Sequence, residues 1–356
     1  MRKLAAACLL ETAYGVRFTE RCGLIGAYTS SDTAAACTIV EAHPVFTSPV
    51  VGVHELKYAL DHVPERVRVV DSTWHGAAHP LRGKKEFKSM HVPSSTYFSI
   101  EDIANKTTPL PRMLPKADVF SKQVSDLGIG NEHHVVIYGG PNTASSARVW
   151  WMFRVFGHER VHILQGGLQV QVREYHTWTS THHASSARHA AAPIAPLPNK
   201  NALPLQSRTW RSGSAPGTIV DVRPPERFHG LQAEPPLPDG LPEPARGHIP
   251  TSINLPWQSV VSAENSQHFL AAPQLSEVFR KAGVDVASDQ PIVTTCSSGI
   301  TAAMVSFALH LYGRDPALNP VFDGSWAEWA TSSDFPIVPA ASQARPPQSS
   351  RTDNAQ

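Results

Sequence analysis

Short runs of consecutive apolar, mostly β-branched residues alternate along the chain with longer stretches that have helical spacing. The runs from Val67 to Asp71 and from Ile292 to Cys296 are typical of strands buried on both faces. The stretches from Val149 to Phe156 and from Ala302 to Tyr312 predict helices, and each is followed by a glycine that can end a helix. This alternation favours an α/β fold, with a mainly parallel sheet flanked by helices.

The pattern occurs twice, because the chain contains an internal repeat. Two separations are the same in both copies: 48 residues for His91 to Gly139 and for His248 to Cys296, and 28 residues for Gly139 to Gly167 and for Cys296 to Gly324. Equal spacings of this kind indicate a duplicated structural unit. We therefore expect two similar domains in tandem, and only the second has a cysteine at the position that Gly139 occupies in the first.

A length of 356 residues accommodates two domains with flanking segments. We expect an N-terminal extension over residues 1–50, a first domain over 51–175, a linker over 176–214, a second domain over 215–335 and a disordered tail over 336–356. The linker is rich in Ser, Ala, Pro and His without an apolar period, and the tail lacks aromatic residues. The linker histidines have no cysteine or carboxylate at ligand spacing, so we expect no metal site there.

The composition limits the kinds of binding partner and the cellular compartment that we expect. The 31 basic and 30 acidic residues give a net charge of +1, which argues against binding to nucleic acid or to an anionic membrane. Three of the four cysteines lie in the first 50 residues, an arrangement unlike a disulfide framework and compatible with a reducing compartment. The first apolar run, from Leu4 to Leu10, is too short to span a bilayer. The basic excess of residues 1–31 resembles a transit peptide, so we predict a monomer in the mitochondrion, with the cytoplasm as the alternative.

The chemistry is predicted to centre on Cys296, which lies between a predicted strand and a predicted helix. The small residues from Ser297 to Thr301 form the intervening loop. Backbone N–H groups of such a loop and of a helix N-terminus favour an anion, and they lower a thiol pKa below its ordinary value of about 8.5. The same pattern also fits a cysteine buried as a small apolar side chain.

Several motifs, in the same order along the chain, resemble those of the tandem rhodanese-type sulfurtransferases. In the second half they are Asp221-Val222-Arg223, Glu226-Arg227-Phe228, Gly247-His248-Ile249-Pro250, the loop Cys296 to Ala302 and the segment Asp323 to Trp329. In the first half they are Asp71 to Trp74, Pro109 to Pro115 and Arg148 to Arg154. The resemblance covers about residues 52 to 332, and the thiosulfate and 3-mercaptopyruvate sulfurtransferases are the most similar members. It implies two rhodanese-like domains and an enzyme that needs no metal or organic cofactor.

The resemblance also implies a mechanism. Cys296 would take a sulfane sulfur from a small donor, become a persulfide, and pass the sulfur to cyanide or to a thiol such as thioredoxin. A cradle of backbone N–H groups would hold that sulfur, formed by Ser297, Ser298, Gly299, Ile300 and Thr301. The small Ser297-Ser298 pair resembles the mercaptopyruvate enzymes, whereas thiosulfate enzymes have basic residues there, so 3-mercaptopyruvate is the predicted donor and thiosulfate the alternative.

Arg227 aligns with a family arginine that binds the carboxylate of mercaptopyruvate, a task suited to a planar fork of donors. The alternative is that Arg227 forms an ion pair with Glu226 or Asp221. A second substrate arginine of the family aligns with Pro236, and Arg246 is a candidate substitute.

A proposed Ser-His-Asp relay of the mercaptopyruvate enzymes aligns here with Ser298, Arg112 and Glu101. A guanidinium cannot shuttle protons at neutral pH. Arg112 could instead contact an anionic donor, which would favour thiosulfate, with Glu101 as its ion-pair partner.

Two rival functions follow from the same residues. A dual-specificity phosphatase would need an arginine six residues after the cysteine, and that position is Ala302. The departures at positions 101, 112 and 236 leave open a non-catalytic rhodanese module that relays sulfur or binds partners, while the intact loop at Cys296 opposes it.

Overall fold

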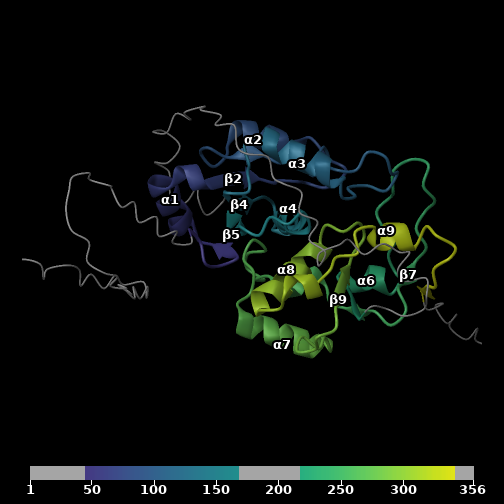
Figure 1. Ribbon diagram of the computed structural model, residues 1–356. Coiled ribbons are helices and arrows are strands. Elements are labelled where there is room, and N and C mark those ends of the chain that lie inside the picture. Colours follow the sequence, from purple (N-terminus) through teal and green to yellow (C-terminus); the bar gives the residue numbers. More distant parts are fainter. Residues whose placement is uncertain (1–44, 168–216, 341–356) are drawn as a thin grey trace, which may run out of the picture. The chain divides into compact units, whose positions relative to one another are not determined.

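The structure is a computed structural model that describes residues 45–167 and 217–340, and both ranges belong to one compact unit. Each range contains a parallel sheet with helices beside it, as the repeat predicts (Figure 1). The predicted linker and its histidines, the cysteines of the first 50 residues and most of the predicted tail lie outside these ranges. In the part of the chain that is described, no helix is long and apolar enough to cross a membrane.

The first half has a five-stranded sheet in which every pairing is parallel. In spatial order its strands are β1 (Val50–Val51), β5 (Val161–Leu164), β4 (His134–Tyr138), β2 (Val67–Asp71) and β3 (Thr96–Tyr97). Its helices are α1 (Val53–His62), α2 (Arg82–Ser89), α3 (Ala117–Asp126) and α4 (Ala144–Val155), with a 3₁₀ turn at Pro64–Arg66. Most residues of β2 and all of β4 are buried, which explains why apolar residues dominate both strands.

Alternate residues of the first sheet face two different sets of helices. Val136 and Tyr138 pack in the same cluster as Leu56 of α1, whereas Val135 and Ile137 pack with the residues of α3 and α4. This is the two-residue period expected of a strand, with apolar side chains needed on both faces because both are covered.

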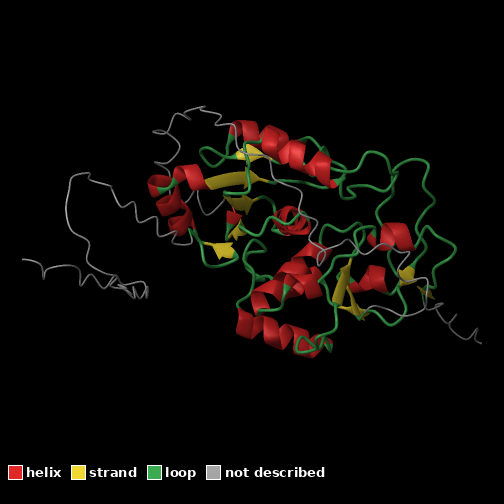
Figure 2. Cartoon of the chain, viewed as in Figure 1, coloured by secondary structure: helices red, strands yellow, loops and turns green. Residues whose placement is uncertain are grey.

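The second half has three paired parallel strands in the order β8 (Ile253–Asn254), β6 (Thr218–Asp221) and β9 (Ile292–Thr295). A parallel bridge from Thr294 to Val321 extends this sheet by one position. The helices are α6 (Pro225–Phe228), α7 (Ala272–Ala282), α8 (Ala302–Tyr312) and α9 (Ser325–Trp329), with 3₁₀ turns at Trp257–Val260 and Pro316–Leu318. Loops make up much of this half, including the path from α6 to β7 (Gly247–His248) (Figure 2).

The two halves share one hydrophobic core, in which α4 and α8 are central. Nearly every residue of α4 and most of α8 are buried, since each helix packs on its own sheet and against the other half. Trp150 of α4 meets Phe307 of α8 edge to face, with 4.8 Å between ring centroids, and stacks on His310. Burial of this apolar surface fixes the carboxyl end of β9 beside the first half.

Two predicted boundaries need correction. The N-terminal extension was expected to reach residue 50, yet Phe46 is already buried and β1 starts at Val50. The disordered tail was expected from residue 336, yet β10 (Val338–Pro339) pairs antiparallel with β7. Both segments are too short to show a period in the sequence, and their pairing partners lie far away along the chain.

Candidate active site

Cys296 directly follows β9, at the carboxyl end of the sheet, and the loop after it leads into α8 at Ala302. Its side chain is 2% exposed. The N–H of Gly299 points at Sγ from 3.1 Å, and Oγ of Ser325 accepts a hydrogen bond from the Cys296 N–H at 3.2 Å. An N–H directed at this position is placed to donate to an anionic sulfur that Cys296 carries.

Gly299 is required by the shape of this loop. Its φ is +78°, a left-handed conformation that glycine adopts without strain. A Cβ at this position would lie 2.7 Å from the carbonyl oxygen of Asp323 and 3.0 Å from Nη1 of Arg148. The loop therefore turns tightly around the sulfur only because residue 299 has no side chain.

Arg148 of α4 anchors this loop from the first half. The residue is fully buried and donates to Asp323 Oδ1 at 2.7 Å, to the Gly299 carbonyl at 3.3 Å and to the Arg112 carbonyl at 2.6 Å. Asp323 also accepts the Leu114 N–H at 2.8 Å. In the sequence Arg148 is recognisable only as part of a motif, because its partners lie in distant segments.

A cavity of about 730 Å³ opens above Cys296, and both halves line it. Ser297, Ser298, Ile300 and Thr301 of the predicted cradle lie on its wall. Arg112 and the indole of Trp74 come from the first half, and Trp257 and Trp326 from the second. A mixture of apolar walls with a few charged groups is typical of small-molecule sites.

The residues aligned with the relay are brought together, with a guanidinium at the centre. Arg112 Nη2 donates to Ser298 Oγ at 3.0 Å, and Arg112 Nη1 lies 3.4 Å from Glu101 Oε1. Glu101 also accepts the Trp74 Nε1–H at 3.0 Å, and the guanidinium lies 5.3 Å from the centre of that indole ring. Burial lowers the pKa of Arg112 and the Glu101 carboxylate opposes this shift, so Arg112 remains charged at neutral pH.

Arg227, on the short helix α6, lines the same cavity and is half-buried. Its Nε is buried and, among the described residues, has no hydrogen-bond partner. The alternative pairing is not formed, since Asp221 instead binds Arg223 and no acid in the described ranges lies within ion-pair distance of Arg227. Arg246 is exposed and lies outside the cavity lining, whereas Pro236 is part of it.

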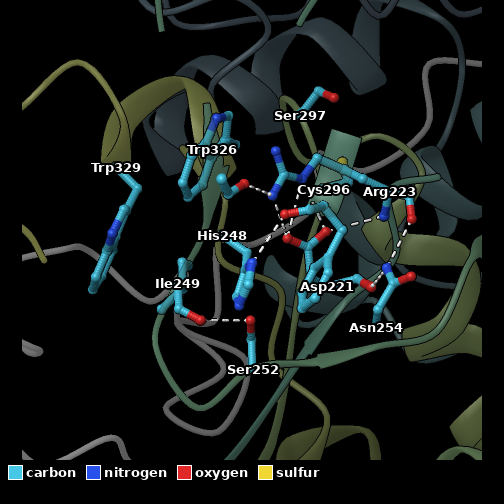
Figure 3. Close-up of polar contacts among 12 residues, drawn as sticks. Asp221, Arg223, His248, Ile249, Ser252, Asn254, Cys296, Ser297, Trp326 and Trp329 are labelled. Atoms are coloured by element: carbon cyan, nitrogen blue, oxygen red, sulfur yellow. Dashed lines mark hydrogen bonds and ion pairs between the residues drawn. The ribbon is translucent and has the colours of Figure 1, made fainter. Parts of the chain in front are cut away.

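A charge network at the cavity wall, in which Asp221, Arg223 and Trp326 lie together, was not predicted from the sequence (Figure 3). Arg223 Nη2 lies 2.6 Å from Asp221 Oδ2, and its guanidinium lies 4.3 Å from the centre of the Trp326 ring. Arg223 Nη1 also lies 2.9 Å from Glu234 Oε1, and the Ser297 hydroxyl donates to Glu234 Oε2. Glu234 begins the proline-rich segment from Glu234 to Pro238, and no local pattern connects it with Ser297.

The equivalent position in the first half has no room for a nucleophile. A Cβ on Gly139 would lie 2.7 Å from Ser145 Oγ and 2.8 Å from Ser72 Oγ. Gln267 of the second half is buried there and approaches the Gly139 carbonyl at 3.4 Å. The duplicated scaffold thus has one cysteine site, and the corresponding space of the other half is filled.

Comparison with known proteins agrees with this arrangement. The profile of the Rhodanese-like domain matches residues 81–174 and 205–332. The chain is 31% identical to Thiosulfate/3-mercaptopyruvate sulfurtransferase 1, mitochondrial, of Arabidopsis thaliana, over 85% of this chain and 83% of that protein. It is 34% identical to thiosulfate sulfurtransferase of Gallus gallus, over 74% of this chain and 86% of that protein.

The solved structures show the same relationship. The crystal structure of SseA from Escherichia coli, described as a 3-mercaptopyruvate sulfotransferase with the rhodanese fold, superposes with a TM-score of 0.64. Its identity is 28%, and the match covers 79% of this chain and 99% of that one. The repeat, the two parallel sheets, the cysteine loop and these matches lead to one assignment. The chain belongs to the rhodanese family, as a tandem two-domain member related to the thiosulfate and 3-mercaptopyruvate sulfurtransferases.

Proposed function

We propose that this protein is a sulfurtransferase that moves a sulfane sulfur from 3-mercaptopyruvate to cyanide or to a thiol acceptor through a persulfide on Cys296. The observation that carries this proposal is the Cys296 sulfur, held at 3.1 Å by the Gly299 N–H at the base of a cavity that Arg227 also lines. A nucleophile beneath an anion-binding group is the arrangement that sulfur transfer needs.

The reaction balances without an oxidant. The Cys296 thiolate attacks the donor sulfur, the sulfur–carbon bond breaks, and its electron pair leaves as the enolate of pyruvate, which takes up a proton. Cys296 then carries a second sulfur as a persulfide anion, and the Gly299 N–H is placed to stabilise it. An acceptor thiolate or cyanide attacks the outer sulfur, and the Cys296 thiolate leaves.

The choice of donor rests on the charges around the cavity. Arg227 has a buried Nε without a partner among the described residues, so a donor carboxylate would satisfy a group that is otherwise unpaired. Thiosulfate is the second candidate, and the observation that favours it is the charged Arg112 on Ser298. We propose mercaptopyruvate because the loop itself contributes the small, neutral pair Ser297-Ser298.

One experiment tests both the chemistry and the donor. The reduced protein is incubated with 3-mercaptopyruvate or thiosulfate, the mass of the Cys296 peptide is measured, and thiocyanate is followed after cyanide is added. We expect a gain of one sulfur that Cys296→Ser abolishes. Loss of charge-assisted bonds should lower kcat/KM for mercaptopyruvate by about 10-fold or more in Arg227→Met, while exposed Arg246→Met serves as the matched control. No added sulfur from either donor would instead favour the non-catalytic module.

Three further assignments accompany this proposal. We propose a non-catalytic rhodanese domain over residues 51–175, a linker over 176–214 and a catalytic rhodanese domain over 215–335. We also propose a monomeric state and a mitochondrial location. The location is supported by the name of one Arabidopsis relative, whereas other relatives carry no such label. Imaging of the full chain fused at its C-terminus to a fluorescent protein tests the location, and sedimentation tests the monomer.

A further inference from the structure

The cavity wall carries a carboxylate that the proposed chemistry does not use. Glu234 lines the cavity close to Cys296 and Ser297, and its side chain is 6% exposed. One carboxylate oxygen lies 2.9 Å from Arg223 Nη1, and the other accepts the hydroxyl of Ser297. Glu234 is thus a buried carboxylate that is hydrogen-bonded to Ser297, the residue next to Cys296. It therefore contributes to the electrostatic field at the sulfur.

The network around Glu234 contains two acidic side chains and one basic one. Arg223 is shared between two carboxylates, Asp221 and Glu234, and all three side chains are almost fully buried. One guanidinium can compensate only one ionised carboxylate. Burial raises the pKa of Asp221, and the contact with Arg223 opposes that shift. Asp221 lies deepest, at the end of β6, whereas Glu234 reaches the cavity, so the carboxylate closest to a bound donor is that of Glu234.

The hydrogen bond from Ser297 to Glu234 also determines which hydrogen bonds Ser297 can still form with a sulfur donor. Its only hydroxyl proton is directed at Glu234, so its oxygen lone pairs, rather than its proton, remain for the cavity. Ser297 therefore cannot donate to an anion while this bond is made. Arg112 and Arg227 line the cavity as cations, so positive and negative groups both contribute to its electrostatic field.

We propose that Glu234 is a specificity-determining residue that disfavours doubly charged sulfur donors relative to singly charged ones. This inference rests on the proposed function. The charge of 3-mercaptopyruvate lies on a carboxylate at the far end from its sulfur, and that carboxylate can bind Arg227. Thiosulfate has two negative charges in a compact group around its sulfur atoms, so it cannot move its charge away from Glu234. The repulsion from one fixed charge is larger for the dianion.

The test compares Glu234→Gln with Glu226→Gln, an exposed acid of the same segment that lies off the cavity lining. The measured quantity is the ratio of kcat/KM for thiosulfate to kcat/KM for mercaptopyruvate. We expect Glu234→Gln to raise this ratio about 10-fold, and the rise to shrink as salt screens the charge. The control should leave the ratio unchanged. Ser297→Ala keeps the carboxylate, so its ratio should stay near that of the unmodified protein.

A readout without sulfur chemistry separates the two proposals. Alkylation of Cys296 by iodoacetate, an anion, is compared with alkylation by neutral iodoacetamide, and Glu234→Gln should raise the ratio of these rates about threefold. Glu234→Ala provides a second variant for both measurements. An unchanged donor ratio in a protein that transfers sulfur, or an equal rise in Ser297→Ala, overturns the role of Glu234. No transfer by the unmodified protein overturns the proposed function itself, and the role in donor selection with it.

Discussion

Replacement of Arg148 by methionine tests how much the first half contributes to the cysteine loop. Methionine keeps much of the apolar stem and removes the guanidinium. Three hydrogen bonds disappear, to Asp323 at 2.7 Å, to the Gly299 carbonyl at 3.3 Å and to the Arg112 carbonyl at 2.6 Å. Asp323, which is 3% exposed, then retains the Leu114 N–H but loses its cation.

The expected loss of stability follows from this burial. Removing one partner of a buried ion pair costs about 3–5 kcal/mol, because the other charge is left without compensation. Arg148 is fully buried, so solvent screening should not reduce this figure. Asp323→Asn alone should cost a comparable amount. The double variant should lose clearly less than the sum of the two single changes, since no uncompensated charge remains.

Urea denaturation followed by tryptophan fluorescence measures the free energy of unfolding for the four proteins of this cycle. Turnover with each donor gives a second readout. Because Arg148 holds the loop but does not line the cavity, kcat should fall for both donors and their ratio should stay unchanged. A loss below about 1 kcal/mol for Arg148→Met, or strict additivity in the double variant, would refute the reasoning.

Two further predictions concern charges that the structure places in contact. Arg112→His should add a loss of thiosulfate turnover as pH rises through about 6.5, because histidine loses its charge there whereas arginine does not. A pH profile identical to that of the unmodified protein would contradict this. Burial, followed by the nearby His162, lowers the pKa of His134 to about 4, so the fold favours the neutral ring. Its ordinary value when unfolded is about 6.5, so unfolding takes up a proton, and stability should fall as pH drops from about 6.5 towards 4. Urea midpoints across this range should fall less steeply in His134→Asn, and parallel curves would exclude this origin.

The hydrogen bonds of the histidine pair favour a neutral ring at His162, whose pKa burial also lowers. His134 Nδ1 lies 3.1 Å from His162 Nε2, and His162 Nδ1 lies 2.7 Å from the Ser48 carbonyl. A carbonyl only accepts, so His162 donates to Ser48 and its other nitrogen accepts the proton of His134. A proton added to His162 Nε2 would face the His134 N–H, and the bond between the rings would be lost.

The sequence allowed prediction of the features that depend on local pattern. The strand ending at Thr295, the loop after it and the helix from Ala302 follow from β-branched residues, small residues and apolar spacing in consecutive segments. The internal repeat also predicts that, in the first half, Gly139 occupies the position equivalent to Cys296. These features need only residues that are neighbours in sequence, or a comparison of the chain with itself.

The contacts that complete the site could not be predicted in this way. Arg148 and Asp323 are 175 residues apart, and Glu234 is 63 residues from Ser297. Each of these pairs joins segments that are distant in sequence and adjacent only in the folded protein. The periodicity of the sequence therefore does not reveal it. The resemblance brought Arg112 and Glu101 forward as candidates, but only the distances show that they form a connected group with Ser298.

The duplication also explains why this site needs both halves. Each half sends a segment to the cysteine position of the other: Gln267 of the second half lies against Gly139, and Arg112 of the first half reaches Ser298 beside Cys296. At Gly139 the incoming side chain is an uncharged amide and the surrounding space is filled, so nothing remains there for a ligand. At Cys296 the incoming side chain is a cation, and a cavity remains above the sulfur. The same exchange of segments thus fills the space at Gly139 with an uncharged amide and places a cation from the first half beside the cavity at Cys296.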